Sequence, residues 1–299
     1  MSAQGVLPGD TAMATLTLKV GDLARMSAYY TAAFGLEGLE DGPDAVVLGR
    51  RRRAMIRLEA APHLHLPQRG DAGLFHTALL FGEQADLAAI VASAARHPLS
   101  SFVGSADHLV SEAFYFTDPE GNGIELYYDR PRDSWGWTED ERGHRTVVMD
   151  SLPLAPRDYL EQHLTEEAAS RAETARASVG HVHLQVGDVD TAHRFYVDVL
   201  GFERTAGWRD QALFVSAGGY HHHMAMNVWN SRGAGPRKDT LGLGEVLIRV
   251  PGTDEVDALA DRLAYAGITS HHTGAELRFE DPWRNRLRVA VAEQPGGIA

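Results

Sequence analysis

The sequence contains no cysteine. This absence excludes disulfides, thiolate nucleophiles, zinc fingers and iron–sulfur clusters, all of which need the cysteine sulfur. A bound metal ion would take its ligands from His, Asp or Glu side chains, and the chain has 15 histidines and 41 acidic residues to supply them. Any metal chemistry in this protein is therefore built from nitrogen and oxygen donors.

The chain also lacks long apolar runs and an excess of positive charge. No apolar stretch approaches the ~20 residues that cross a bilayer, and the first ten residues have neither the basic nor the apolar region of a signal peptide, so we expect a soluble, cytoplasmic protein. The net charge is −13, whereas phosphate binding needs clustered Lys and Arg. We expect neither a membrane nor a nucleic acid as a partner.

What the sequence does contain is an internal repeat. Residues 20–37 align at a constant offset with residues 186–203, and both begin with Val-Gly-Asp. In each copy an alternating strand leads into a helix that the aspartate caps and a glycine ends. The chain is therefore interpreted as a tandem duplication, which fits the two domains expected of 299 residues.

A second, fainter repeat lies inside each copy. Residues 75–81 have the pattern of another opening strand, and a helix is predicted at about 84–95. Residues 244–250 and a helix at about 255–266 open the last unit in the same way. The sequence thus predicts an α+β protein of four βαβββ modules, two in each domain.

The predicted domain boundaries follow from this repeat. Residues 1–130 form the N-terminal domain and residues 178–299 the C-terminal domain. Between them, residues 131–177 hold two tryptophans, a charged run and a helix predicted at about 157–164. This segment is too long and too regular for a bare tether, so we interpret it as a connector packed on the domains.

One stretch of the chain, DHLVSEAFYFTDPEGNGIE, ends at Glu125. Its aromatic segment 111–117 suits a strand, and Gly121 and Gly123 are predicted to supply the positive φ angles of a hairpin turn. In the strand that follows, Glu125 faces opposite to its two aliphatic neighbours. The carboxylate is then either a solvated surface group or a ligand in a concavity.

The same stretch resembles a family signature. Six positions match the type I extradiol ring-cleavage dioxygenases in spacing, namely His108, Phe114, Tyr115, Asp118, Gly121 and Glu125. Ala106 departs from that pattern, because the family usually has Gly, Asn, Thr, Ile or Val there. In the family the glutamate binds iron, and the tyrosine and histidine line the substrate site. The four modules resemble the vicinal oxygen chelate fold, and the chain is most similar overall to tandem-domain catechol 2,3-dioxygenase-like proteins.

The resemblance implies a ligand set, because in this superfamily the metal lies between two modules. Module two offers His76 and Glu125, and module three offers His181. In module four Arg288 stands where Glu125 stands in module two, and a cation there would repel a metal. We therefore expect modules two and three to pair across the domain boundary and modules one and four to form a metal-free counterpart. Two histidines and a carboxylate suit Fe(II), with Mn(II) as the alternative.

The run His221-His222-His223 is expected on the last strand of module three. If Met224 packs inward, alternation turns His223 toward the concavity, either as a fourth metal ligand or as an acid–base residue. We favour the acid–base role. A register uncertainty of one residue keeps His222 open for the same place.

Other residues are predicted around the substrate. The resemblance implies that Tyr115 and His108 hydrogen-bond a substrate oxygen. His183 lies two residues from His181 on the same face, and with His222 and Trp229 it is a predicted pocket residue.

The predicted activity is extradiol (meta) cleavage of a catechol-type diol by O2 in aromatic compound catabolism. Two alternatives stay open: a glyoxalase-like isomerase or lyase with Ni, Zn or Mn and four protein ligands, and a non-catalytic, resistance-type protein that binds a small molecule without a metal. The sequence does not determine the identity of the diol, the native metal or the oligomeric state, a homo-oligomer included.

Overall fold

The computed structural model describes residues 6–139, 143 and 145–292, and most of its strands form two large mixed sheets. One sheet has the strand order β17 (Ser270–His272), β18 (Glu276–Glu280), β19 (Arg286–Val291), β16 (Gly242–Val250), β1 (Ala12–Val20), β4 (Arg53–Ala60), β3 (Ala45–Arg50) and β2 (Glu37–Asp41). The other has the order β11 (Leu152–Pro153), β6 (Ser101–Asp107), β7 (Ser111–Thr117), β8 (Gly123–Asp129), β5 (Gly73–Phe81), β12 (Ala177–Gln185), β15 (Met224–Asn227), β14 (Ala212–Ser216) and β13 (Glu203–Trp208).

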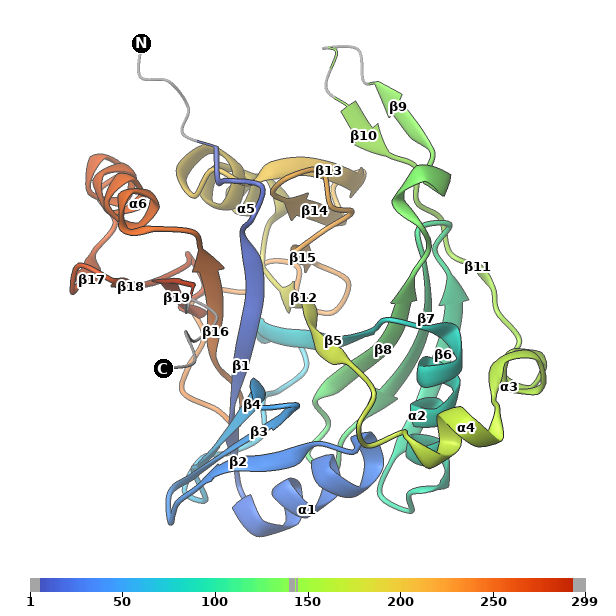
Figure 1. Ribbon diagram of the computed structural model, residues 1–299. Helices are drawn as coiled ribbons and strands as arrows, with labels where there is room; N and C mark the ends of the chain where they lie inside the picture. The colour runs from blue at the N-terminus through green and yellow to red at the C-terminus, as the bar shows by residue number, and fades with distance from the viewer. Residues whose placement is uncertain (1–5, 140–142, 144, 293–299) are drawn as a thin grey trace, which may run out of the picture.

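Each sheet joins a module of the first copy with a module of the second: modules two and three in one sheet, and modules one and four in the other. Figure 1 shows β5 beside β12 at the centre of one sheet and β1 beside β16 in the other, and both pairs are antiparallel. The expected pairing of module two with module three is confirmed. The division of the chain at residues 130 and 177 follows the sequence repeat, and each sheet takes strands from both sides of it.

Helices cover the sheets where the repeat predicts them. The described helices are α1 (Leu23–Phe34), α2 (Gln84–Arg96), η1 (Arg132–Ser134), α3 (Pro156–His163), α4 (Glu166–Ser170), α5 (Val189–His193), the π-helical turn η2 (Arg194–Val199) and α6 (Thr253–Tyr265). Apolar residues from α1, α2, α5 and α6 join those of both sheets in one continuous core. None of these helices is long and apolar enough to cross a membrane.

The two copies of the duplication begin their helices in the same way. Asp22 accepts a hydrogen bond from the backbone of Arg25 at the start of α1, and Asp188 accepts one from Thr191 at the start of α5. Gly35 ends α1 with a φ of 60°. The predicted aspartate caps are confirmed, and each anchors the loop that follows a central strand.

A buried tyrosine–aspartate pair also occurs in both copies. The Tyr30 hydroxyl donates to Asp118 at 2.9 Å, and the Tyr196 hydroxyl donates to Asp281 at 2.9 Å. Each aspartate opens the turn before the last strand of the following module, β8 or β19. The aspartate of the signature stretch therefore fixes the turn that precedes Glu125, and does not reach the site itself.

The connector packs on the N-terminal half of the chain, as expected. Its predicted helix is α3, and the buried guanidinium of Arg50 donates to the backbone carbonyls of Ala172 and Ala175 after α4. Before these helices, β9 (Trp137–Glu139) and β10 (Arg145–Val147) form a hairpin that stands beyond the end of β7 and β8 in Figure 1.

Candidate metal centre and active site

Three side chains converge on the concave face of the sheet that joins modules two and three. His76 lies on β5, Glu125 on the neighbouring β8 and His181 on β12, at the other side of β5. Glu125 Oε2 lies 2.9 Å from His76 Nε2 and 3.0 Å from His181 Nε2. Ala78 is the cross-strand neighbour of both Glu125 and His181, so only a methyl group stands between them.

The donor atoms of this triad fit a divalent metal ion. They lie within 4.8 Å of one another, and the triad is the one such group of His, Asp and Glu among the described residues. His76 Nε2 is buried, and apart from the Glu125 carboxylate at 2.9 Å it has no hydrogen-bond partner in the part of the chain that the structure describes. A buried lone pair without a donor is costly in a purely structural site, whereas a metal ligand needs it.

The protonation states of the triad also suit a metal. Burial lowers the pKa of His181 to about 4, although Glu125 opposes this shift, so the ring is neutral at pH 7. Burial alone would raise the pKa of Glu125, but His181 and His76 outweigh it and hold that pKa well below its usual range. Neutral imidazole and carboxylate are the forms that bind metal ions.

Gly123 allows β8 to approach β5 closely. A Cβ atom at this position would lie 2.1 Å from the carbonyl oxygen of Phe75 and 3.0 Å from the Cβ of His76. The predicted positive φ is found at Gly121, with 85°, but not at Gly123, where the prediction was wrong. The close approach of the two strands here depends on the missing side chain of Gly123 rather than on a left-handed backbone.

The triad lies in a cavity of about 730 Å³. The two aliphatic neighbours of Glu125, Ile124 and Leu126, are buried in the core, so the predicted orientation of the carboxylate is confirmed. The cavity also has walls from β6, β7, β13 and β14, and from the connector residues Thr138, Thr146, Val147, Val148, Met149, Asp150 and Ser151. The connector is therefore part of the site, which the sequence reasoning missed.

Tyr115 and His108 form a hydrogen-bonded pair in the wall. The Tyr115 hydroxyl lies 2.7 Å from His108 Nε2, and His108 Nδ1 lies 2.8 Å from the carbonyl oxygen of Asp150. A carbonyl only accepts, so Nδ1 of His108 donates to Asp150, and its Nε2 shares the second hydrogen bond with the Tyr115 hydroxyl. Burial, and next the charge of Glu125, raise the pKa of Tyr115 well above its usual value, so the phenol stays protonated.

The histidine run contributes His222 to the cavity, and not His223. The prediction that His223 faces the cavity was wrong: its ring is buried elsewhere, and Nδ1 accepts a hydrogen bond from the backbone of Ala217. The reason is that β15 begins only at Met224. The preceding turn has positive φ at Gly218 and Gly219, so strand alternation does not extend back to the histidines.

A hydrogen-bond chain behind His222 was not predicted. The Nδ1 atoms of His222 and His221 lie 2.7 Å apart, and His221 Nε2 lies 2.8 Å from Asp129 Oδ1. Asp129 also accepts from the hydroxyl of Tyr220 at 2.8 Å. The sequence did carry one signal of this contact, because Asp129 is four residues from Glu125 on the same face of β8.

His183 and Trp229 are in the cavity wall, as are the other predicted pocket residues. His183 Nε2 accepts from the Asn227 side chain at 2.9 Å, and its ring contacts Phe75 edge to face. The Trp229 ring packs on Phe75, with 5.3 Å between the two ring centroids. About half of the Trp229 side chain is exposed. Of the predicted site residues, the structure brings together at the cavity His76, His108, Tyr115, Glu125, His181, His183, His222 and Trp229.

The sheet of modules one and four has an ion pair at the corresponding place. Arg288 Nε lies 3.0 Å from Glu245 Oε1, and Arg278 also approaches Glu245, at 3.6 Å. The carboxylate is neutralised by guanidinium groups there. Among the described residues, the group of His and Glu that could hold a metal ion lies in the other sheet.

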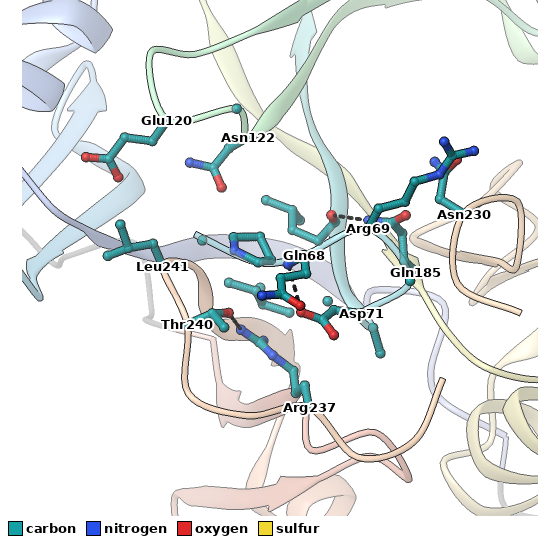
Figure 2. Close-up of a pocket in the computed structure, with 18 residues that line it drawn as sticks. Gln68, Arg69, Asp71, Glu120, Asn122, Gln185, Asn230, Arg237, Thr240 and Leu241 are labelled. Carbon is teal, nitrogen blue, oxygen red and sulfur yellow. Dashed lines mark hydrogen bonds between the residues drawn. The ribbon is translucent and has the colours of Figure 1, made fainter. Parts of the chain in front are cut away.

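A second cavity of about 240 Å³ lies where the two sheets meet, at the start of β5 and β16 (Figure 2). It is polar, and Figure 2 shows that its side chains bond within the protein: Arg237 reaches Thr240, the Asp71 carboxylate accepts from the Gln68 backbone, and Gln185 donates to the Leu74 carbonyl. We interpret this cavity as a gap between loops that pack against one another.

Comparison with known proteins places this geometry in a family. The Glyoxalase/Bleomycin resistance protein/Dioxygenase superfamily matches residues 12–126 and 178–289. The chain belongs to this superfamily. The sequence is 34% identical over 280 residues to a catechol-2,3-dioxygenase of Bacillus subtilis, and the match covers 91% of this chain and 94% of that protein.

Solved structures of this superfamily share the fold at low identity. Glyoxalase I of Zea mays superposes with a TM-score of 0.57 at 15% identity, over 94% of this chain and 92% of that one. The cppA protein of Streptococcus pneumoniae gives 0.56 at 11% identity, over 95% and 99% of the two chains. These likenesses show that the chain shares its fold with both proteins.

Proposed function

We propose that this protein is an extradiol dioxygenase that cleaves the ring of a catechol-type diol with O2. The observation that carries the proposal is the convergence of His76, His181 and Glu125 in a large cavity, in a chain 34% identical to a catechol-2,3-dioxygenase. Two histidines and one carboxylate leave coordination positions open, which is the arrangement of non-haem Fe(II) oxygenases. Mn(II) is the alternative metal.

The triad would hold the metal ion, and bound Fe(II) would supply redox chemistry that brings a diol and O2 together. The side chains of the protein would carry out the remaining steps. Both oxygen atoms of O2 enter a ring-opened product, so the reaction needs no external reductant. It does need the two hydroxyl protons of the diol to be moved.

We assign the first proton transfer to His222. Burial holds its pKa well below the usual value, so the ring is neutral, and its Nδ1 is engaged by His221. The Nε2 lone pair is then free to take a hydroxyl proton from the diol. A histidine placed for such a transfer contributes roughly a hundredfold to ten-thousandfold in rate.

Tyr115 and His108 would act at the opposite wall of the cavity. The phenol is protonated and its hydrogen bond to His108 fixes its direction. A substrate oxygen that gains negative charge would be stabilised by the phenol if its one proton turned from His108 toward that oxygen. Phe75 and Trp229 would contact the ring of the diol with their aromatic faces and edges.

The test is anaerobic reconstitution with Fe(II), followed by O2 uptake and the visible absorbance of a ring-opened product after catechols are added. Stoichiometric O2 uptake with a yellow product is the expected result. Tight metal binding with no O2 uptake on any catechol would contradict the proposal and favour a glyoxalase-like isomerase. Failure to bind Fe(II), Mn(II), Ni(II) or Zn(II) would favour a binding protein without metal chemistry.

A further inference from the structure

The cavity is much larger than a single ring requires. Its volume of about 730 Å³ falls in the range of roughly 300–1,000 Å³ that encloses drug-sized ligands. The triad that would bind the metal lies on β8, β5 and β12, the three central strands of the sheet. The two hydroxyl groups of a diol would lie at the triad. A diol with a single ring is small compared with the cavity, so the outer part of the cavity, away from the triad, would stay unfilled.

The outer part has exposed apolar walls from three separate elements. Val103 of β6 is 66% exposed, Trp208 of β13 is 54% exposed, and Val148, just after β10, is 40% exposed. All three line the cavity, together with Met149. Large apolar side chains that water contacts on several sides of one cavity are typical of a ligand site.

Small residues are among those that line the cavity. Ala106 lines it on β6, and Ala206 and Gly207 line it on β13. Ala106 is the position at which the chain departs from the dioxygenase signature. Residues 146–151 of the connector line the same cavity, so the connector and the sheet enclose it together.

We propose that the natural diol carries a bulky apolar substituent, and that Val103, Val148, Met149 and Trp208 bind it. This subsite rests on the proposed function, since it assumes that the diol end of the ligand lies at the triad. An acidic substituent is disfavoured. Arg204 is the one Lys or Arg among the described lining residues, and Asp150 offsets its charge.

The experiment compares three diols with the Fe(II)-loaded protein: catechol, a phenyl-substituted catechol and a carboxylate-bearing catechol. We expect kcat/KM for the phenyl compound to exceed that for catechol by about tenfold or more. Equal values for catechol and the phenyl compound, or a preference for the carboxylate compound, would overturn the subsite.

Two variants locate the effect. Val148→Trp fills the outer region, so it should lower kcat/KM for the phenyl compound about tenfold and leave that for catechol unchanged. Leu99→Trp is the matched control, because Leu99 is an exposed apolar residue outside the cavity lining. It should change neither value. An equal loss for both diols in Val148→Trp would overturn the subsite, because the effect would not depend on the substituent.

The affinity of the metal-free protein for each diol tests the subsite separately from the proposed function, because no turnover is needed. Quenching of tryptophan fluorescence, with Trp208→Ala as the reference, measures affinity without turnover. Tighter binding of the phenyl compound that Val148→Trp abolishes would support the subsite even if no diol were cleaved. Equal affinity for catechol and the phenyl compound would reject the subsite, whatever the activity.

Discussion

His221 Nε2 lies 2.8 Å from Asp129 Oδ1, although 92 residues separate the two in the chain. The carboxylate accepts, so Nε2 of His221 carries the proton and its Nδ1 offers a lone pair. That lone pair accepts the Nδ1 proton of His222 at 2.7 Å. In this arrangement Nδ1 of His222 donates to His221, and Nε2 is the nitrogen of His222 that has a lone pair.

The first prediction follows from this fixed tautomer. His221→Phe removes the acceptor for His222 and lets the ring turn or change tautomer, so kcat should fall about 10- to 100-fold, as for partners of functional histidines elsewhere. KM and the bound metal per chain should be unchanged. Steady-state kinetics and metal analysis of the same preparation measure this. Loss of metal in step with kcat would show that His221 acts through the triad instead.

The second prediction distinguishes the two neighbouring histidines. His222→Ala should keep the metal and lower kcat by roughly a hundredfold or more, because the proton acceptor is gone. His223→Ala should keep both metal and turnover, since His223 does not line the cavity. Single-turnover rates with a saturating diol make the comparison. Loss of the metal from His222→Ala would show that His222 is a fourth metal ligand. That result would favour the glyoxalase-like isomerase function.

The third prediction concerns the triad and its counterpart. Glu125→Ala removes the shared carboxylate, so metal binding and any O2 uptake should be lost. Glu245→Ala is the matched control, because this carboxylate lies in an ion pair with Arg288 in the other sheet. Isothermal titration with Fe(II) or Mn(II) should give one site per chain for the wild type and for Glu245→Ala. Retention of the metal by Glu125→Ala would reject the triad.

The fourth prediction concerns stability and its pH dependence. Tyr30→Phe removes a hydrogen bond to the buried carboxylate of Asp118 and should lower the free energy of unfolding by about 2 kcal/mol at pH 7. Tyr196→Phe should have a similar effect at Asp281. Urea denaturation of each variant beside the wild type gives both values.

The pH dependence has a defined sign. Burial raises the pKa of Asp118 above its usual value, while the hydrogen bonds from Asn122 and then Tyr30 oppose this shift. Loss of the tyrosine donor raises that folded-state pKa further, so the stability difference from wild type should shrink as the pH falls through it. A difference that stays constant between pH 7 and about pH 4 would show that lost packing, and not the charge of Asp118, is the cause.

Periodicity predicted the elements that the triad depends on. Strand alternation around Glu125 and the repeat of opening strands gave the faces of β5, β8 and β12, because both rules act locally along a hydrogen-bonded strand. The same reasoning failed at His223, the residue directly before β15. Alternation holds only within the strand, and the turn at Gly218 and Gly219 breaks it.

The sequence by itself determined the modules, their helix caps and the side chains able to bind a metal, since these depend on short-range patterns and on residue chemistry. The tertiary structure alone decided that His222 is the histidine of the run that faces the cavity. It also decided that Asp129 supports that residue and that the connector closes the cavity. These features depend on contacts between segments that are far apart in the chain, and such contacts form only when the two halves of the duplication pack into one sheet.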